Sequence, residues 1–166
     1  MIRPDRIGHV VIKVRDLERS KKFYSEVLGL TQMGEVKEFK IAFFAANRND
    51  HHELGLIEVG PEAEDGKFEQ VGLLHFAFRM KSYDELREAY RELKARNVPV
   101  VATTDHGVAR GVYFKDPDGN EMELYVDGDP AEFGKWPNPY AGVQKLDFAE
   151  DSPGLMDSVP TVPAPK

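Results

Sequence analysis

The chain of 166 residues carries 29 acidic and 22 basic residues, a formal net charge of −7 at pH 7, and it contains no cysteine. Its length predicts one domain with a substantial hydrophobic core, and its acidic balance argues against nucleic acid or an anionic membrane as a partner. The lack of cysteine excludes disulfide bonds, thiolate metal sites and a cysteine nucleophile. We expect a cytoplasmic protein, because the first residues lack the apolar segment of a secretory signal and no apolar run approaches the ~18 residues of a membrane span.

The first part of the chain predicts one helix among four strands. Asp16 is a suitable N-cap for the helix, and Gly29 would end it. The strands are rich in β-branched and aromatic residues. The expected elements are strands at 7–14, 31–36, 39–45 and 51–59 and a helix at 17–28.

The same order of elements then starts again. Ser82 and Glu85 form a capping box for a helix that runs to about Arg96, and Asn97 is an expected left-handed stop. The last two strands form a hairpin around the turn 116–120, because proline fixes one backbone angle there and Gly119 and Asn120 accept a positive φ. The expected strands are 73–80, 98–103, 111–115 and 121–126.

A β-α-β-β-β order therefore occurs twice, in modules at about 5–60 and 72–127, and the fold class is α+β. His9 and His75 are each the third residue of the first strand of a module, if those strands begin at Ile7 and Leu73. A repeat of this size implies two modules related by an approximate two-fold axis. We therefore expect the two histidines to face each other across a shared cavity.

Residues 128–166 form an expected proline-rich extension to the paired domain at 1–127, and they hold seven of the eleven prolines. The part after about Ser152 is expected to be disordered. Five apolar side chains in the extension are candidates for docking on the domain or on a second subunit, which indicates a homo-oligomer. They are Phe133, Trp136, Tyr140, Leu146 and Phe148.

His9, His75 and Glu123 carry the main functional hypothesis. Two neutral imidazoles and one carboxylate form a facial triad that leaves up to three positions open on an octahedral metal, which suits non-haem Fe(II) and O₂. A single strand histidine is more often an ordinary core or surface residue. Two of them at matched module positions, together with a glutamate at an apolar strand end, are hard to explain by packing. Glu121 is the competing carboxylate, because it lies on the same strand face as Glu123.

The adjacent residues His51 and His52 are a second unusual feature. Neighbours on a strand point to opposite faces, so only one of them is expected to face the cavity. A histidine that holds no metal there can act as a general acid or base near neutral pH. The other interpretation is a solvated turn end.

The double βαβββ pattern with histidines on the first strands resembles the vicinal oxygen chelate superfamily, which includes glyoxalase I and antibiotic-resistance proteins. A spaced set of residues resembles the signature of type I extradiol ring-cleavage dioxygenases. HHELGL at 51–56 and LLHFAF at 73–78 resemble that family's histidine-bearing strands, and the resemblance covers residues ~5–127. The spaced set is Thr104, His106, Val112, Tyr113, Asp116, Pro117, Gly119 and Glu123.

The resemblance implies a single-domain relative of catechol 2,3-dioxygenases and 2,3-dihydroxybiphenyl dioxygenases, with a cupped, incomplete barrel around a metal site. Such an enzyme cleaves catechols with O₂ to muconic semialdehydes. The side chain of His51 is expected to point away from the site, and Mn²⁺ in place of Fe(II) stays open, since both suit this ligand set. The implied iron ligands are His9, His75 and Glu123, the implied acid–base residue is His52, and the implied catechol-binding residues are His106 and Tyr113.

Two other functions stay open. A glyoxalase-like lyase or isomerase on the same fold would use Ni²⁺ or Zn²⁺ and a fourth protein ligand from the strand 51–59. Glu58 lies about 20 Å from His52 along an extended strand, and Glu53 could serve only if His52 points outward. A metal-free small-molecule-binding protein would leave the three proposed iron ligands unexplained. Arg110 could pair with a substrate carboxylate, although solvent exposure is the simpler interpretation.

Overall fold

The computed structural model describes residues 1–47, 49–133, 144–146 and 148, and it separates into two compact units. The first unit comprises Met1–Phe68 and Pro117–Asn120, and the second comprises Glu69–Asp116 and Glu121–Lys166. The order strand, helix, strand, strand, strand occurs once in each unit. The βαβββ repeat predicted from the sequence is therefore confirmed, and each unit is described by itself below.

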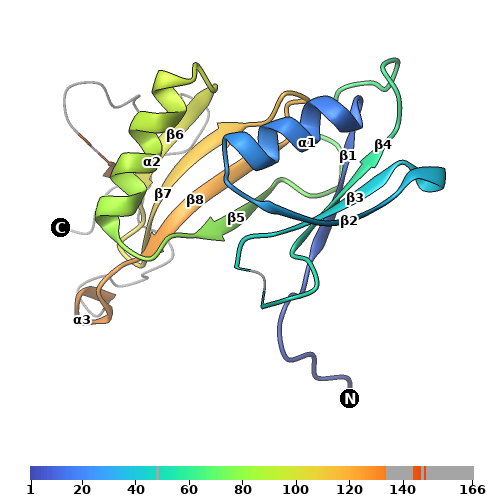
Figure 1. The fold of residues 1–166 in the computed structure, drawn as a ribbon. Coiled ribbons are helices and arrows are strands. Elements are labelled where there is room, and N and C mark those ends of the chain that lie inside the picture. The colour runs from blue at the N-terminus through green and yellow to red at the C-terminus, as the bar shows by residue number, and fades with distance from the viewer. Residues whose placement is uncertain (48, 134–143, 147, 149–166) are drawn as a thin grey trace. The chain divides into compact units, whose positions relative to one another are not determined.

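The first unit is a four-stranded mixed sheet with the α-helix α1 (Figure 1). Its strand order is β1-β4-β3-β2, and β1 runs parallel to β4 while the other pairs are antiparallel. The buried core includes Tyr24, Phe44, Leu54 and Leu56, none of which is measurably exposed. The elements are β1 (Val10–Val14), α1 (Leu17–Glu26), β2 (Thr31–Val36), the short 3₁₀ helix η1 (Lys37–Phe39), β3 (Ile41–Ala45) and β4 (Leu54–Glu58).

Both long helices begin at the predicted caps. The Asp16 side chain accepts a hydrogen bond from the backbone N–H of Arg19 at the start of α1, and Ser82 accepts one from Glu85 at the start of α2 (Tyr83–Ala95). These bonds satisfy backbone donors that have no partner within the helix. Past the end of α2, Asn97 has a φ of 56°, so the left-handed stop is confirmed.

The second unit is a five-stranded sheet with strand order β5-β8-β7-β6-β9. Its strands β7 and β8 form the predicted hairpin, and Gly119 in the connecting turn has a φ of 86°. Strand β5 runs parallel to β8, which is therefore flanked by β5 and β7. The elements are β5 (His75–Arg79), α2, β6 (Val100–Asp105), β7 (Ala109–Lys115), β8 (Glu121–Asp127), the short α3 (Pro130–Phe133) and β9 (Gln144–Lys145).

Several strands start later than the sequence predicts, and three of these late starts affect predicted site histidines. Strands β1 and β5 begin at Val10 and His75, and β4 begins at Leu54. Each of these strands needs a neighbour to pair with: the first pairs are Val10 with Leu54 and His75 with Glu121. Since β8 starts only after the hairpin turn, β5 cannot pair before His75. His51 and His52 therefore precede β4 rather than lying within it.

Part of the C-terminal extension lies on the second unit. Leu146 and Phe148 are buried, the hydroxyl of Thr103 donates a hydrogen bond to the carbonyl of Leu146 at 2.8 Å, and the Phe148 ring stacks on Tyr90 with centroids 5.0 Å apart. Docking on the domain is therefore confirmed for these two apolar residues. Trp136, Tyr140, the side chain of Phe133 and the residues after Ser152 lie outside the described part of the chain.

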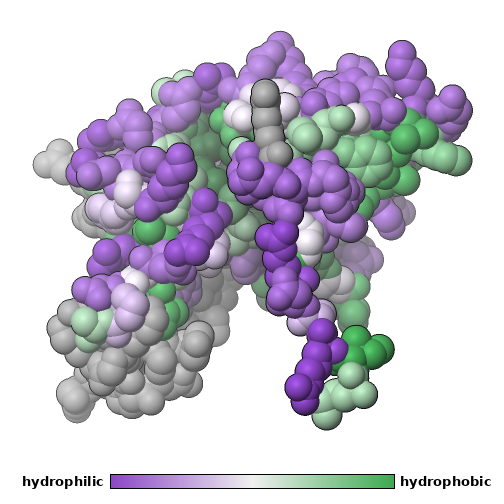
Figure 2. Space-filling view, turned by 60° about the horizontal axis from the view of Figure 1, so that its bottom comes forward, coloured by the Kyte–Doolittle hydropathy of each residue, from purple (hydrophilic) through white to green (hydrophobic). Residues whose placement is uncertain are grey.

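The surface agrees with the charged composition of the sequence. Hydrophilic side chains cover most of the face shown in Figure 2, and hydrophobic ones reach the surface in smaller groups between them. Within the described residues, none of the helices combines the length and the apolar composition that crossing a bilayer requires.

Candidate active site

Glu123 lies at the centre of a polar group on the second unit. It stands on β8 directly opposite Tyr113 of β7, and its carboxylate lies over Gly111. A Cβ atom at Gly111 would come within 2.1 Å of Glu123 Oε1. Glycine at this position therefore gives the carboxylate its space, and the side chain of Glu123 is almost fully buried, with 8% of the residue exposed.

The imidazole of His75 faces this carboxylate. His75 Nε2 lies 3.6 Å from Glu123 Oε2, although Glu121 is the residue opposite His75 in the strand register. Hydrogen bonding to the Glu123 carboxylate, together with its negative charge, raises the pKa of His75 against the effect of partial burial. The geometry thus joins His75 to Glu123, the carboxylate that the sequence analysis favours over Glu121.

Tyr113 and His106 complete this group. Tyr113 Oη lies 3.5 Å from His106 Nε2, and the Tyr113 ring meets the His75 ring edge-on with centroids 5.3 Å apart. Burial and the Glu123 carboxylate raise the pKa of the Tyr113 hydroxyl. That hydroxyl stays protonated at neutral pH, so it is available as a hydrogen-bond donor.

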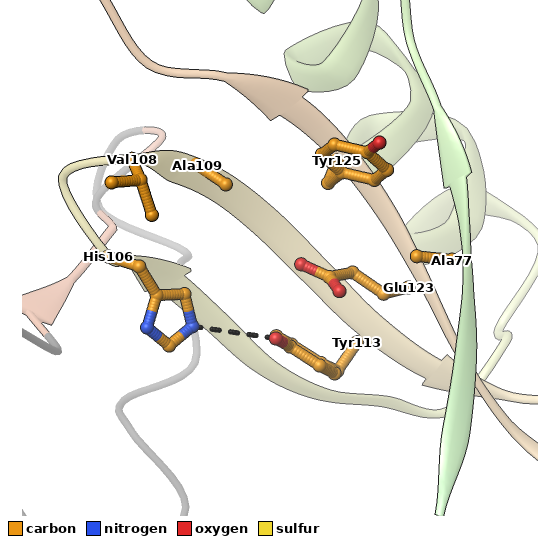
Figure 3. Close-up of a pocket in the computed structure, with 7 residues that line it drawn as sticks. All are labelled: Ala77, His106, Val108, Ala109, Tyr113, Glu123 and Tyr125. Carbon is orange, nitrogen blue, oxygen red and sulfur yellow. Dashed lines mark hydrogen bonds between the residues drawn. The ribbon is translucent and has the colours of Figure 1, made fainter. Parts of the chain in front are cut away.

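Of this group, Glu123, Tyr113 and His106 line a cavity of about 430 Å³ in the second unit (Figure 3). Figure 3 shows the Glu123 carboxylate between the rings of Tyr113 and Tyr125, with His106 across from it. Small apolar side chains form the remaining wall, which suits a flat ring with few polar groups. The lining residues are Ala77, His106, Val108, Ala109, Tyr113, Glu123 and Tyr125.

Arg110 is held by neighbours in the same unit. Its Nε donates to Asp105 Oδ2 at 2.8 Å, and its guanidinium lies over the Tyr83 ring, 5.5 Å from the centroid. A substrate carboxylate would have to compete with Asp105 for this side chain. The structure thus offers an internal partner for Arg110.

The other predicted histidines gather in the first unit. His9 precedes β1 and His52 precedes β4, and their ring centroids lie 4.4 Å apart. Burial, followed by the positive charges of His51 and His9, lowers the pKa of His52, so its imidazole is neutral at neutral pH. The ring of His51 lies 4.3 Å from that of His52. His51 is thus close to the other two rings, because the alternation of an extended strand does not apply before Leu54.

The two carboxylates considered as a fourth metal ligand have other partners. Glu53 accepts hydrogen bonds from the backbone N–H of Ala46 and from Asn47, and Glu58 accepts one from the N–H of Leu17 at 3.0 Å and pairs with Lys40. These contacts work against either glutamate as a fourth metal ligand.

The predicted site residues thus form two groups. His75, His106, Tyr113 and Glu123 come together in the second unit, while His9 and His52 come together in the first. The ligand set His9, His75 and Glu123 draws on both units and stays a prediction. The sequence analysis did not identify Gly111 as the residue that makes room for Glu123; a glycine inside a strand was the available signal.

The residues of the second unit fit a metal ion of the kind the sequence predicts. Two ligand atoms at adjacent octahedral positions with bonds of about 2.1 Å lie about 3 Å apart. The separation of 3.6 Å between His75 Nε2 and Glu123 Oε2 is close to that value. Imidazole with carboxylate is also a donor combination that divalent iron and manganese accept.

Comparisons with known proteins support the superfamily that the sequence pattern resembles. Residues 6–124 match the model of the family described as the glyoxalase/bleomycin resistance protein/dioxygenase superfamily. The chain is 29% identical over 123 residues to biphenyl-2,3-diol 1,2-dioxygenase 3 of Rhodococcus globerulus, covering 74% of this chain and 63% of that protein. It is 33% identical over 122 residues to catechol-2,3-dioxygenase of Bacillus subtilis (strain 168), covering 73% and 41%. The match therefore spans less than two thirds of either relative.

A solved structure of similar fold is that of lactoylglutathione lyase from Agrobacterium tumefaciens. The TM-score is 0.58 at 24% identity, and the match covers 74% of this chain and 94% of that one. At this identity the similarity concerns the fold alone.

Proposed function

Because the chain belongs to the glyoxalase/bleomycin resistance protein/dioxygenase superfamily, we propose that it is an Fe(II)-dependent extradiol dioxygenase. It would cleave the ring of catechol-type diols with O₂ to give muconic semialdehydes. The chain has the α+β fold of that superfamily, with the two βαβββ modules predicted from the sequence. One observation carries the proposal: the buried Glu123 carboxylate faces His75, and Glu123, Tyr113 and His106 line the same cavity.

The proposed ligands are His75 and Glu123 from the second unit and His9 from the first. When bound to such a set, Fe(II) supplies a centre that holds a diol and O₂ together and passes electron density between them. Mn²⁺ suits the same ligands and stays an alternative metal. We still expect a cytoplasmic homo-oligomer. Its partners would be a catechol and O₂, and we expect it to bind neither nucleic acid nor a membrane.

Tyr113 and His106 would orient the diol. The hydroxyl of Tyr113 keeps its proton because its pKa is raised, so Oη–H can donate a hydrogen bond to a negatively charged diol oxygen. His106 Nε2 lies 3.5 Å from this oxygen in the lining of the same cavity, so a second polar group would be available to the diol. Ala77, Val108 and Ala109 provide an apolar wall for the ring.

His52 is the proposed acid–base residue. Its lowered pKa leaves the imidazole neutral at neutral pH, so it can accept a proton from a diol hydroxyl and return it during ring cleavage. General acid–base catalysis of this kind contributes roughly 10²–10⁴ in rate. The His52→Ala variant is therefore expected to keep iron and to lose about that factor in kcat.

The test is anaerobic reconstitution with Fe(II), followed by a panel of substituted catechols and air. A yellow ring-fission product is expected. Glu123→Gln should lose iron and activity, whereas the matched change Glu121→Gln on the same strand should keep both. No product from any catechol at full iron loading would contradict the proposal. Product from methylglyoxal and glutathione with Ni²⁺ would favour a glyoxalase-like lyase instead.

A further inference from the structure

We propose that His9, His51 and His52 form a separate metal site in the first unit, for an imidazole-binding divalent ion such as Zn²⁺. Each histidine offers one ring nitrogen, and the three nitrogens all lie within 4.8 Å of one another. The site is distinct from the proposed iron ligand set, because it needs His51 and His52 in place of His75 and Glu123.

The backbone brings these rings together. Strands β1 and β4 lie side by side and parallel (Figure 1), and the backbone N–H of Val10 donates to the carbonyl of Glu53 at 3.0 Å. The residues just before the two strands are therefore neighbours at the same edge of the sheet. A bend at His51 turns its ring toward His52, and the His9 and His51 rings lie 5.9 Å apart.

The nitrogens are available for a metal. Over residues 1–47 and 49–133, no hydrogen bond or ion pair reaches any of the three rings. Nearby carboxylates have other partners, since Asp50 pairs with Arg6 and Glu53 binds the backbone of Ala46. An ion approaching this edge would therefore meet imidazoles as its principal protein ligands.

The arrangement suits Zn²⁺ in particular. Zinc binds three histidines and keeps a fourth position for water, with Zn–N bonds of about 2.0–2.1 Å. Nitrogens on such a tetrahedron lie about 3.4 Å apart, so small ring rotations from the present separations would be sufficient. His9 and His51 are exposed, which gives an ion a path from solvent. His52 packs against Phe43 with centroids 4.8 Å apart, beside a cavity of about 320 Å³.

A consequence for regulation rests on the proposed function. His9 belongs both to this site and to the proposed iron ligand set, so one ion at a time can use it. Zn²⁺ bound by His9, His51 and His52 would make His9 unavailable as an iron ligand and so inhibit the binding of Fe(II). His51 is absent from the iron set, so its removal is expected to relieve this inhibition.

The experiment uses the full chain with the His75→Ala change, which removes one proposed iron ligand. Zn²⁺ is added and the ring signals of the remaining histidines are followed by NMR, while affinity is measured by competition with a chromophoric chelator. The signals of His9, His51 and His52 should shift together at one equivalent of Zn²⁺. A further His51→Ala change should weaken binding at least tenfold, whereas the matched change His106→Ala should leave it unchanged.

Zinc affinity that does not depend on His51, or shifts confined to other histidines, would overturn the proposal. Should the His75→Ala chain fail to fold, Co²⁺ binding to the otherwise unaltered chain gives the same comparison through its visible spectrum, with and without His51→Ala. Neither readout uses turnover. Absence of ring cleavage with a His51-dependent zinc site would therefore contradict the proposed function alone, and the reverse result would contradict the zinc site alone.

Discussion

At Gly111 the backbone of β7 leaves space that the Glu123 carboxylate occupies. An added methyl group would lie 2.1 Å from Glu123 Oε1, so the Gly111→Ala change must displace the carboxylate. We expect a loss of stability of about 1–3 kcal/mol, typical of overpacking, and a weaker affinity for Fe(II). Chemical denaturation and an anaerobic iron titration would measure the two effects.

The matched control for this change is Gly72→Ala, where an added methyl group meets no atom within 4 Å. It should affect neither stability nor iron affinity. Full iron affinity in Gly111→Ala would mean that the position of Glu123 does not matter for metal binding, which would contradict its assignment as a ligand.

The Tyr113 hydroxyl is expected to matter for turnover rather than for folding. Tyr113→Phe keeps the ring that packs against His75 and removes the oxygen that contacts His106 Nε2. A hydrogen bond to a charged group contributes about 1.5–3 kcal/mol, so kcat/KM for a catechol should fall roughly 10- to 100-fold. Steady-state kinetics check this, with Tyr125→Phe in the same cavity as the control. An unchanged kcat/KM would exclude Tyr113 as a diol-binding residue.

At the residue scale, the sequence predicts candidate site residues but not all of the contacts between them. His75 and Glu123 were predicted from residue type and spacing, whereas the roles of Tyr113 and His106 came from the resemblance to type I extradiol dioxygenases. The structure brings the four side chains together. The position of His51 beside His9 was not predicted, because it depends on where β4 starts to pair with β1. The partner of Arg110 was missed for a similar reason, since it lies on the neighbouring strand.

At the scale of elements, local signals predicted both helices and the hairpin. Asp16 and Ser82 bind backbone N–H groups three residues further along, and Asn97 adopts a left-handed backbone conformation itself, so each of these signals is local in the sequence. Strand starts depend on partners far along the chain, which explains the late starts of β1, β4 and β5. The short strand β9 pairs with β6 over a large sequence separation and was not predicted.

Glu58 connects three elements of the first unit and predicts a pH dependence. Its carboxylate pairs with Lys40 and accepts the N–H of Leu17 at the start of α1, and these hydrogen bonds lower its pKa below the ordinary value of 4.5. A carboxyl group whose pKa is lower in the folded state stabilises the fold above its unfolded pKa. This stabilisation is lost as the pH falls through the folded value.

We therefore expect Glu58→Gln to lower the Tm by a constant amount above about pH 4.5, with the difference from the unaltered chain shrinking at lower pH. Thermal unfolding at a series of pH values measures it. The exposed Glu62, changed to Gln, should show no difference at any pH. A difference that grew on acidification would show that the carboxylate of Glu58 is not stabilised by its partners.

At the scale of the whole molecule, the proposed iron ligands belong to both units, because His9 lies in one and His75 and Glu123 lie in the other. An ion bound only by the folded chain stabilises it by about 2.7 kcal/mol at a free concentration of 100 times Kd. For a chain of this size that corresponds to a Tm increase of about 5–10 °C.

Anaerobic thermal unfolding with and without Fe(II) measures this increase. The unaltered chain and His51→Ala should show all of it, whereas His9→Ala and Glu123→Ala should lose most of it. If His9→Ala kept the full increase, the second unit would bind the ion without the first. The facial triad would then have to be replaced by a site built from His75 and Glu123 alone.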